Sequence, residues 1–285
     1  MNSNIWQGGT APGGRPFFNE TAREYQDVRP GYDSALVERV LHYAGRPAAA
    51  AEIGAGTGKA TEAFVAAGLC VRCVEPDASM AAQLTQRFGR RDVIVDVRRF
   101  EEWEPAEPPL LIYAAQSWHW LDSERRCARA ASLLARGGAL ALFGHRYLLA
   151  DPEVAAAVDP AYMAHAPHLL GDPEANRVPA ARYWYTTELA GSGWFVDVEA
   201  DDFSQVIRFD VETYLRLVST FSSHRVLGDR ALAALIGRLR RDFRGLDHID
   251  VELATVLTLA RRPSHDRPSS SRSGSALARR RSMRL

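Results

Sequence analysis

The sequence predicts an α/β fold in which a doubly wound, mostly parallel sheet carries helices on both faces. Short apolar runs alternate with segments of helical periodicity through residues 34–143. One of these runs leads into a glycine-rich turn that opens a helix, which is typical of strand–turn–helix units in parallel sheets. The chain has 285 residues, of which 46% are hydrophobic, so it can bury one large core.

The glycine-rich turn is the stretch around which the rest of the chain is organised. The chain turns through Gly54, Gly56 and Gly58, and a helix is expected over residues 59–67. Glycines at alternate positions permit backbone conformations that are closed to residues with a Cβ atom. They also leave room for a ligand to lie against the main chain.

An acidic residue stands at the tip of each strand that flanks this turn. Glu52 closes the apolar run before the glycines, and Glu75 closes a second run over residues 69–74. Units of this kind bind nucleoside cofactors at the carboxyl ends of their strands, where the second acid binds ribose hydroxyls. The central unit therefore predicts a nucleoside-cofactor site.

The spacing of the glycines separates two classes of cofactor. The nicotinamide fingerprint reads G-x-G-x-x-G/A. Here Gly58 falls one place early and Lys59 occupies the fingerprint position. Binding of a dinucleotide pyrophosphate also does not require an acidic residue such as Glu52 just before the turn. A nicotinamide-dependent oxidoreductase remains an alternative, disfavoured by this spacing.

The pattern E-x-G-x-G-x-G from Glu52, followed by an acid at the next strand end, resembles the class I S-adenosylmethionine-dependent methyltransferases. Two further stretches resemble the trans-aconitate-methyltransferase-like group: Y-x-x-x-R-P-x-Y from Tyr25, and A-Q-x-x-H-W-x-D from Ala115. The likeness covers residues 17–262. It implies a Rossmann-like sheet of seven strands in the order 3-2-1-4-5-7-6, with strand seven antiparallel.

The resemblance also implies a set of cofactor-binding residues. In such proteins the N-terminal stretch folds over the methionine end of the cofactor, and the loop after the third strand flanks the adenine. A solvated, charged loop is the alternative for residues 98–103. The implied S-adenosylmethionine site consists of Tyr25, Arg29, Glu52, Gly54, Gly56, Gly58, Glu75, Pro76, Met80, Phe100, Glu101, Gln116 and Ser117.

The loop after the fourth strand carries the candidate catalytic residue. His119 lies between Trp118 and Trp120, whereas turns usually favour Gly, Pro, Asn and Asp. In the similar methyltransferases this loop lines the space between donor and acceptor. His119 is expected to act as a general base or to orient the acceptor, and the alternative is a hydrogen-bonded structural histidine.

The other elements follow from the same periodicities. Helices are expected after Ser34 and Asp77, and after Ser123 on the far side of the fourth strand. A late helical region contains His224, for which an exposed position is expected. The remaining strands are expected at residues 93–97, 110–115, 139–143, 194–203 (an edge strand) and 251–260, with no strand between residues 144 and 194.

We expect one methyltransferase domain over residues 17–262, with cap insertions at about 145–193 and 209–247. The insertions are too apolar for linkers and are expected to cover an acceptor pocket. Residues 1–16 are expected to be a flexible N-terminus, and residues 263–285 a disordered basic tail.

Composition and missing motifs limit the class of acceptor substrate that is expected. Residues 261–285 contain eight arginines and one aspartate, so the rest of this neutral chain carries a charge of −7, which argues against a nucleic-acid surface. The (N/D)-P-P-(Y/F) turn of nucleic-acid amine methyltransferases is replaced by residues 115–118, and no Pro-Cys pair occurs. A small-molecule acceptor is therefore expected, first a hydroxyl or carboxylate oxygen, with nitrogen and carbon open.

Three further expectations concern metal binding, cellular location and a role without catalysis. Cys70 and Cys73 form a C-x-x-C pair on a strand, where they point to opposite faces, and no second pair completes a metal site. No run of 18 apolar residues occurs, so a cytoplasmic protein without membrane contact is expected. A cofactor-binding relative without turnover, acting as a regulatory protein, remains an alternative, and the sequence does not indicate the oligomeric state.

Overall fold

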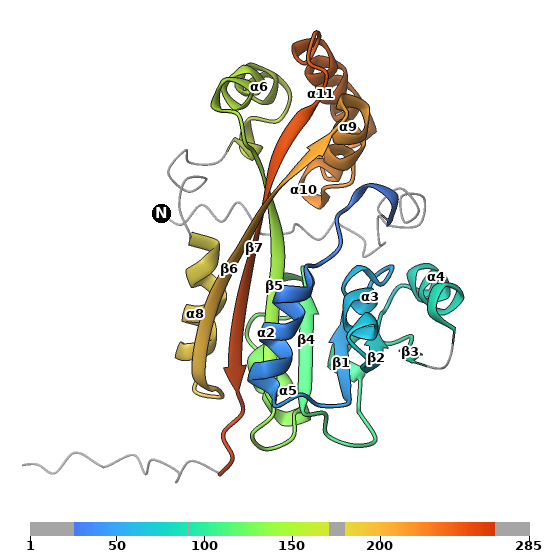
Figure 1. The fold of residues 1–285 in the computed structure, drawn as a ribbon, viewed down its shortest axis with the longest axis vertical. Coiled ribbons are helices and arrows are strands. Elements are labelled where there is room, and N and C mark those ends of the chain that lie inside the picture. The colour runs from blue at the N-terminus through green and yellow to red at the C-terminus, as the bar shows by residue number, and fades with distance from the viewer. Residues whose placement is uncertain (1–25, 90–91, 171–179, 266–285) are drawn as a thin grey trace, which may run out of the picture.

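The computed structural model describes residues 26–89, 92–170 and 180–265. The expectations for the N-terminus, for Tyr25 and for the tail beyond residue 265 lie outside these residues. The described residues form one sheet in the order β3-β2-β1-β4-β5-β7-β6, as the resemblance implied (Figure 1). The strands are β1 (Ala49–Ile53), β2 (Cys70–Val74), β3 (Val93–Asp96), β4 (Leu111–Ala115), β5 (Ala139–Leu149), β6 (Val196–Phe209) and β7 (Ile249–Arg261).

Strands β1 to β5 run parallel, and β7 runs antiparallel to both of its neighbours. Apolar clusters cover both faces of the sheet, so its central strands are buried on both sides. One cluster packs α2 (Ser34–Ala44), α3 (Lys59–Ala66) and α4 (Ala78–Phe88) onto the sheet. The other packs α5 (Arg126–Leu133) and α8 (Ala180–Gly191) onto the opposite face.

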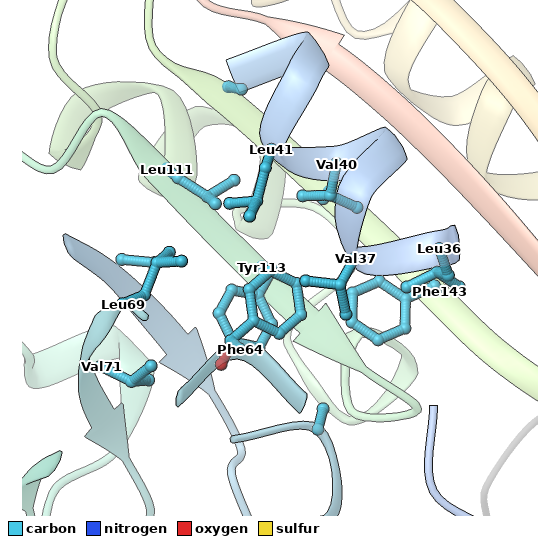
Figure 2. Packing of buried hydrophobic residues seen from close by; sticks show 14 of the residues in the cluster. Leu36, Val37, Val40, Leu41, Phe64, Leu69, Val71, Leu111, Tyr113 and Phe143 are labelled. Atoms are coloured by element: carbon cyan, nitrogen blue, oxygen red, sulfur yellow. The ribbon is translucent and has the colours of Figure 1, made fainter. Parts of the chain in front are cut away.

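Figure 2 shows the first cluster from close by. Val37 and Val40 on α2 point toward a group of aromatic rings. Phe64 stacks on Tyr113 with ring centroids 4.0 Å apart, and Phe143 lies beside both rings. Burial of rings of this size supplies much of the stabilisation of an α/β core, so this cluster anchors α2 and α3 to β4 and β5.

The last three strands are longer than the others and extend past the tips of β1, β2 and β4 (Figure 1). Their far ends carry a separate apolar cluster formed with several helices. We call this group the cap: α6 (Pro152–His165), α9 (Val211–Ser219), α10 (Ser222–Arg225) and α11 (Asp229–Asp242).

The prediction of no strand between residues 144 and 194 was wrong at its start, because β5 continues to Leu149. The continuation pairs with β7, so that His145 lies opposite Thr255 and Tyr147 opposite Leu253. This extension of β5 is held by a partner strand more than a hundred residues away. Its own sequence does not form an apolar run, so the sequence pattern did not predict it.

Other sequence expectations concern metals and membranes. Cys70 is exposed and Cys73 is buried, as expected for opposite faces of β2, and neither is in a disulfide. Within the described ranges no group of three or more His, Cys, Asp or Glu side chains is arranged to hold a metal ion. None of the helices in the same ranges has the length and apolarity needed to span a membrane.

A buried carboxyl ties the start of α3 to the sheet. Glu52 on β1 is 1% exposed. One of its oxygens accepts hydrogen bonds from the hydroxyls of Thr61 on α3, at 2.5 Å, and of Tyr113 on β4, at 2.9 Å. Burial raises the pKa of Glu52 from its ordinary 4.5 to about 7, although the two hydrogen bonds favour the charged form.

This pKa predicts a pH dependence of stability. Between about pH 4.5 and pH 7 the folded protein keeps a proton on Glu52 that the unfolded chain has released, so the folded state loses stability as pH rises through this window. Glu52→Gln has no carboxyl to titrate. As pH rises across the window, the free energy of unfolding of the native protein should fall by about 3 kcal/mol relative to that of the variant, at 1.36 kcal/mol per pKa unit. Urea unfolding at a series of pH values measures this difference, and parallel profiles for the two proteins would contradict it.

Gly58, at the start of α3, lies against α4. Its φ is +86°, and a Cβ atom there would stand 2.5 Å from Leu84 Cδ1 and 2.6 Å from Phe88 Cε2. Gly68 has a nearly equal φ of +90°, but no atom in the part of the chain that the structure describes lies within 4 Å of such a Cβ. Gly58 therefore meets two constraints, a left-handed backbone and a close approach, whereas Gly68 meets only the first.

The two glycines form a matched pair of test positions. Gly68→Ala should lower the free energy of unfolding by roughly 1–2 kcal/mol, the cost of placing a Cβ atom in the left-handed region. Gly58→Ala should lower it by roughly a further 1–3 kcal/mol, because the side chains of Leu84 and Phe88 on α4 must shift to admit the Cβ atom. Chemical denaturation of both variants gives the comparison, and equal losses would show that α4 does not constrain the turn.

Candidate active site

The carboxyl ends of β1, β2 and β4 meet at one edge of the sheet, as parallel strands require. Ile53 lies opposite Val74, and Glu52 lies opposite Tyr113. The segments that follow these strands are therefore neighbours: the glycine turn, Glu75 and the loop that begins at Gln116. The predicted site residues from the central unit and from the fourth strand are brought together here.

Glu75 joins the turn after β1 to the start of α4. Its Oε2 accepts a hydrogen bond from the Gly56 N–H at 2.8 Å, and its Oε1 accepts one from the Asp77 N–H at 2.8 Å. The side chain is 5% exposed, and burial raises its pKa, although both backbone hydrogen bonds oppose that shift. A carboxylate offers about four acceptor positions, so Glu75 can accept further hydrogen bonds from a ligand.

The glycine turn packs tightly on one side and is open on the other. A Cβ atom on Gly54 would lie 2.5 Å from the Cβ of Ser117, whose hydroxyl donates to the Ile53 carbonyl. Among the described residues, a Cβ atom on Gly56 would meet only Met80 Sδ, at 3.9 Å. The contact at Gly54 holds the tips of β1 and β4 together, and the space at Gly56 is where a ligand can approach the main chain.

The acid that precedes the turn is placed differently. The carboxyl of Glu52 faces α3 and is engaged by Thr61 and Tyr113. We therefore expect Glu52 to support the turn from the helical side of the sheet.

Arg29 connects three parts of the chain that are distant in sequence. Its Nη1 donates to Gln116 Oε1 at 3.1 Å, and its Nε and Nη2 donate to the hydroxyl and carbonyl of Thr220 at 3.1 and 2.9 Å. The guanidinium also lies 5.2 Å from the ring centroid of Phe221. Arg29 therefore links the N-terminal segment to the β4 loop and to the cap.

Gln116 is shaped for this contact by its backbone. Its φ is +56°, which is uncommon for a residue other than glycine and often marks a functional position. Sequence reasoning singled out Arg29 and Gln116 but missed Thr220 and Phe221. No signal in the sequence indicates that these two residues lie beside the others.

His119 lies in a short 3-10 turn, η2 (Trp118–Trp120), just beyond β4. Burial and the nearby guanidinium of Arg126 lower its pKa from 6.5 to about 4. The imidazole is therefore neutral at pH 7 and can accept a proton. Trp118 is 1% exposed, whereas Trp120 is 42% exposed and its ring lies 5.1 Å from that of His119.

The loop after β3 has two kinds of residue. Phe100, in the 3-10 turn η1 (Phe100–Glu102), is 3% exposed and belongs to the apolar cluster that contains Ile53 and Val74. Glu101 is exposed and lies 3.5 Å from Arg99. The solvated-loop alternative therefore fits Glu101 but not Phe100.

The last two predicted residues, on the segment after β2, are Pro76, which is exposed, and Met80, which is buried.

Two buried histidines, one on β5 and one in the cap, pack against aromatic side chains. His145 stacks on Tyr32 at 4.2 Å, and its Nε2 lies 3.1 Å from the Gly31 carbonyl. The expectation of an exposed His224 was wrong: this residue is 7% exposed, and its Nε2 lies 2.9 Å from the Tyr162 hydroxyl. Burial lowers the pKa of both histidines to about 4.

Comparison with known proteins gives both sequence and structure matches. No protein-family model matches the chain. An uncharacterized methyltransferase of Mycobacterium tuberculosis is 30% identical over 131 residues, which are 44% of this chain and 50% of that protein. The chain thus spans about half the length of the curated relatives it matches.

Among solved structures, a candidate type II methyltransferase from Anaeromyxobacter dehalogenans has a TM-score of 0.60 at 25% identity, over 83% of this chain and 99% of that one. A phosphoethanolamine N-methyltransferase of Haemonchus contortus, in complex with phosphomonomethylethanolamine and S-adenosylhomocysteine, has a TM-score of 0.50 at 13% identity. It covers 87% of this chain and 58% of that one. The fold of the chain is therefore the Rossmann-like fold of class I methyltransferases.

Proposed function

We propose that the protein transfers a methyl group from S-adenosylmethionine to a small-molecule acceptor. The observation that carries the proposal is the bridge between Glu75 and the Gly56 N–H, which places a carboxylate beside an open glycine turn at the tips of two parallel strands. The sequence match to proteins named methyltransferases and the shared fold support it.

The residues at the strand tips fit such a cofactor. Glu75 keeps acceptor positions for ribose hydroxyls, and Gly56 leaves its face of the turn open beside Met80. Arg29, whose nitrogens donate to Gln116 and Thr220, is proposed to pair with a carboxylate of the cofactor through a planar two-pronged contact that replaces part of these bonds. When bound, S-adenosylmethionine supplies a methyl group that is already activated by its positively charged sulfur.

The protein's own contribution is then to hold the acceptor in line and to exclude water. Orientation of this kind can contribute roughly 7–11 kcal/mol to a transfer step. The cap, tied to the β4 loop through Arg29, is suited to cover the acceptor. His119 is proposed to orient an acceptor hydroxyl or to take its proton. Its lowered pKa of about 4 keeps the imidazole neutral at pH 7 and able to accept a hydrogen bond, but makes it a weak base.

The acceptor atom proposed first is oxygen, of a hydroxyl or a carboxylate, because a neutral histidine beside the strand tips can hydrogen-bond to such a group. Nitrogen and carbon acceptors are the alternatives. A small acceptor agrees with the acidic body of the chain and with the apolar cluster of the cap. The similar Haemonchus protein was solved with a small phosphorylated amine. We therefore propose a cytoplasmic small-molecule enzyme that does not act on nucleic acid.

Glu75→Ala should weaken the binding of S-adenosylhomocysteine at least about tenfold, because ribose hydroxyls and the Gly56 N–H lose a charged partner in a buried place. Isothermal titration calorimetry measures the affinity. Glu38→Ala, an exposed change on α2 at a residue that pairs with Arg46, is the control and should bind within about twofold of the native protein.

The same titration distinguishes the alternatives. If the native protein binds NAD and not S-adenosylhomocysteine, the proposed function is wrong and the oxidoreductase is favoured. If S-adenosylhomocysteine binds but a broad acceptor screen with labelled donor shows no transfer, the regulatory protein is favoured. Equal affinities of Glu75→Ala and the native protein would remove Glu75 from the site.

His119→Ala should lower the turnover number roughly a hundredfold, the usual loss when a general base is removed, and should leave the affinity for S-adenosylhomocysteine unchanged. Turnover is measured with the acceptor that the screen identifies. His248→Ala, which removes a partly exposed histidine beside Asp250, is the control and should retain activity. A fully active His119→Ala variant would leave His119 with a structural role.

A further inference from the structure

A buried ion pair lies beneath the turn that carries His119. Arg126 is on α5 and Glu188 is on α8, and their side chains are 4% and 17% exposed. The Nε and Nη2 atoms of Arg126 donate to the two carboxylate oxygens of Glu188 at 2.6 and 2.8 Å. The Cys127 thiol donates to the same carboxylate at 3.3 Å. The pair thus has the two-pronged geometry of strong charge-assisted hydrogen bonds.

The remaining arm of the guanidinium reaches the turn itself. Arg126 Nη1 donates to the Trp118 carbonyl at 2.8 Å, and the guanidinium carbon lies 5.5 Å from the centroid of the Trp118 ring. That carbonyl belongs to the peptide bond between Trp118 and His119. The guanidinium therefore holds the main chain at the residue immediately before His119, and it packs against the indole of the same residue.

A buried pair of this kind is poorly explained as a source of stability alone. The cost of taking two charges out of water offsets much of their attraction, and apolar residues of similar size often serve as well. What a bidentate pair supplies is a fixed position, because all three arms of the guanidinium are directed at once. Here the fixed position is that of η2, at the edge of the sheet where the site residues meet.

We propose that Arg126 and Glu188 are positioning residues for His119: Glu188 orients the guanidinium, and the guanidinium fixes the turn from which the imidazole reaches the acceptor. The catalytic part of this inference rests on the proposed function. The positional part depends only on the contacts among α5, α8 and η2. None of the sequence motifs pointed to the pair, whose members are 62 residues apart.

The test removes the charge that orients Arg126. Glu188→Gln keeps the shape of the side chain, and it should lower the turnover number at least about tenfold while leaving the KM for the donor and the affinity for S-adenosylhomocysteine within about twofold. Glu212→Gln is the matched control, because Glu212 forms a bidentate pair with Arg240 at 2.7 and 2.7 Å on the exposed surface of the cap. The control should be unchanged in all three quantities.

A second measurement does not need turnover. Proton–carbon NMR of the histidine rings, with the His119 signal assigned from His119→Gln, should show this signal moved in Glu188→Gln and the signal of His248 unmoved. If the native protein fails to bind S-adenosylhomocysteine, the proposed function fails, but the NMR comparison still decides whether the pair positions His119.

A further variant covers the case in which Glu188→Gln does not fold. Arg126→Gln/Glu188→Gln removes both charges together, so no uncompensated charge stays buried, and it should also move the His119 signal. A folded variant of either kind with an unmoved His119 signal and native turnover would overturn the proposal.

Discussion

The hydrogen bond from the Gly56 N–H to Glu75 is the interaction on which the site depends. Because β1 and β2 are parallel neighbours in register, the residues just past their ends are adjacent, and a single side chain spans the gap. The second oxygen of Glu75 binds the Asp77 N–H, and Asp77 in turn caps α4. Glycine turn, acid and helix start are therefore fixed by one buried carboxyl group, which is hydrogen-bonded to two backbone N–H groups.

The cap is positioned by the length of the strands that carry it and by its contacts with the N-terminal segment. β5, β6 and β7 have 11, 14 and 13 residues, whereas β1 and β2 have five each, so the long strands act as a stem that carries the cap beyond the shorter tips. Arg29 then ties the cap to the β4 loop through Thr220 and Gln116. A change in what Arg29 binds would be transmitted to both at once, because the same guanidinium serves both contacts.

Local features were the ones that the sequence could predict. The glycine turn, the two acids and the strands β1 to β4 lie within about one residue of their expected places, since each strand is a short apolar run, and β1 and β4 are largely buried on both faces. The strand order came from family resemblance. What could not be predicted depends on distant partners: the extension of β5 along β7, the contact of Arg29 with Thr220, and the ion pair of Arg126 with Glu188. In each of these three contacts the two partners are far apart in the sequence, so the sequence around one partner does not indicate the other.

The two acids of the central unit look alike in sequence, yet their surroundings separate their roles. Glu75 is held by backbone N–H groups and faces the open side of the turn, whereas Glu52 is held by two hydroxyls from α3 and β4. A pKa of about 7 means that Glu52 is partly protonated at neutral pH. Such a group is a poor constant partner for a ligand, but it joins helix to sheet in either protonation state, because a carboxyl oxygen accepts from hydroxyls in both. The acid before the turn therefore joins α3 to the sheet, and the acid after the second strand joins the glycine turn to the start of α4.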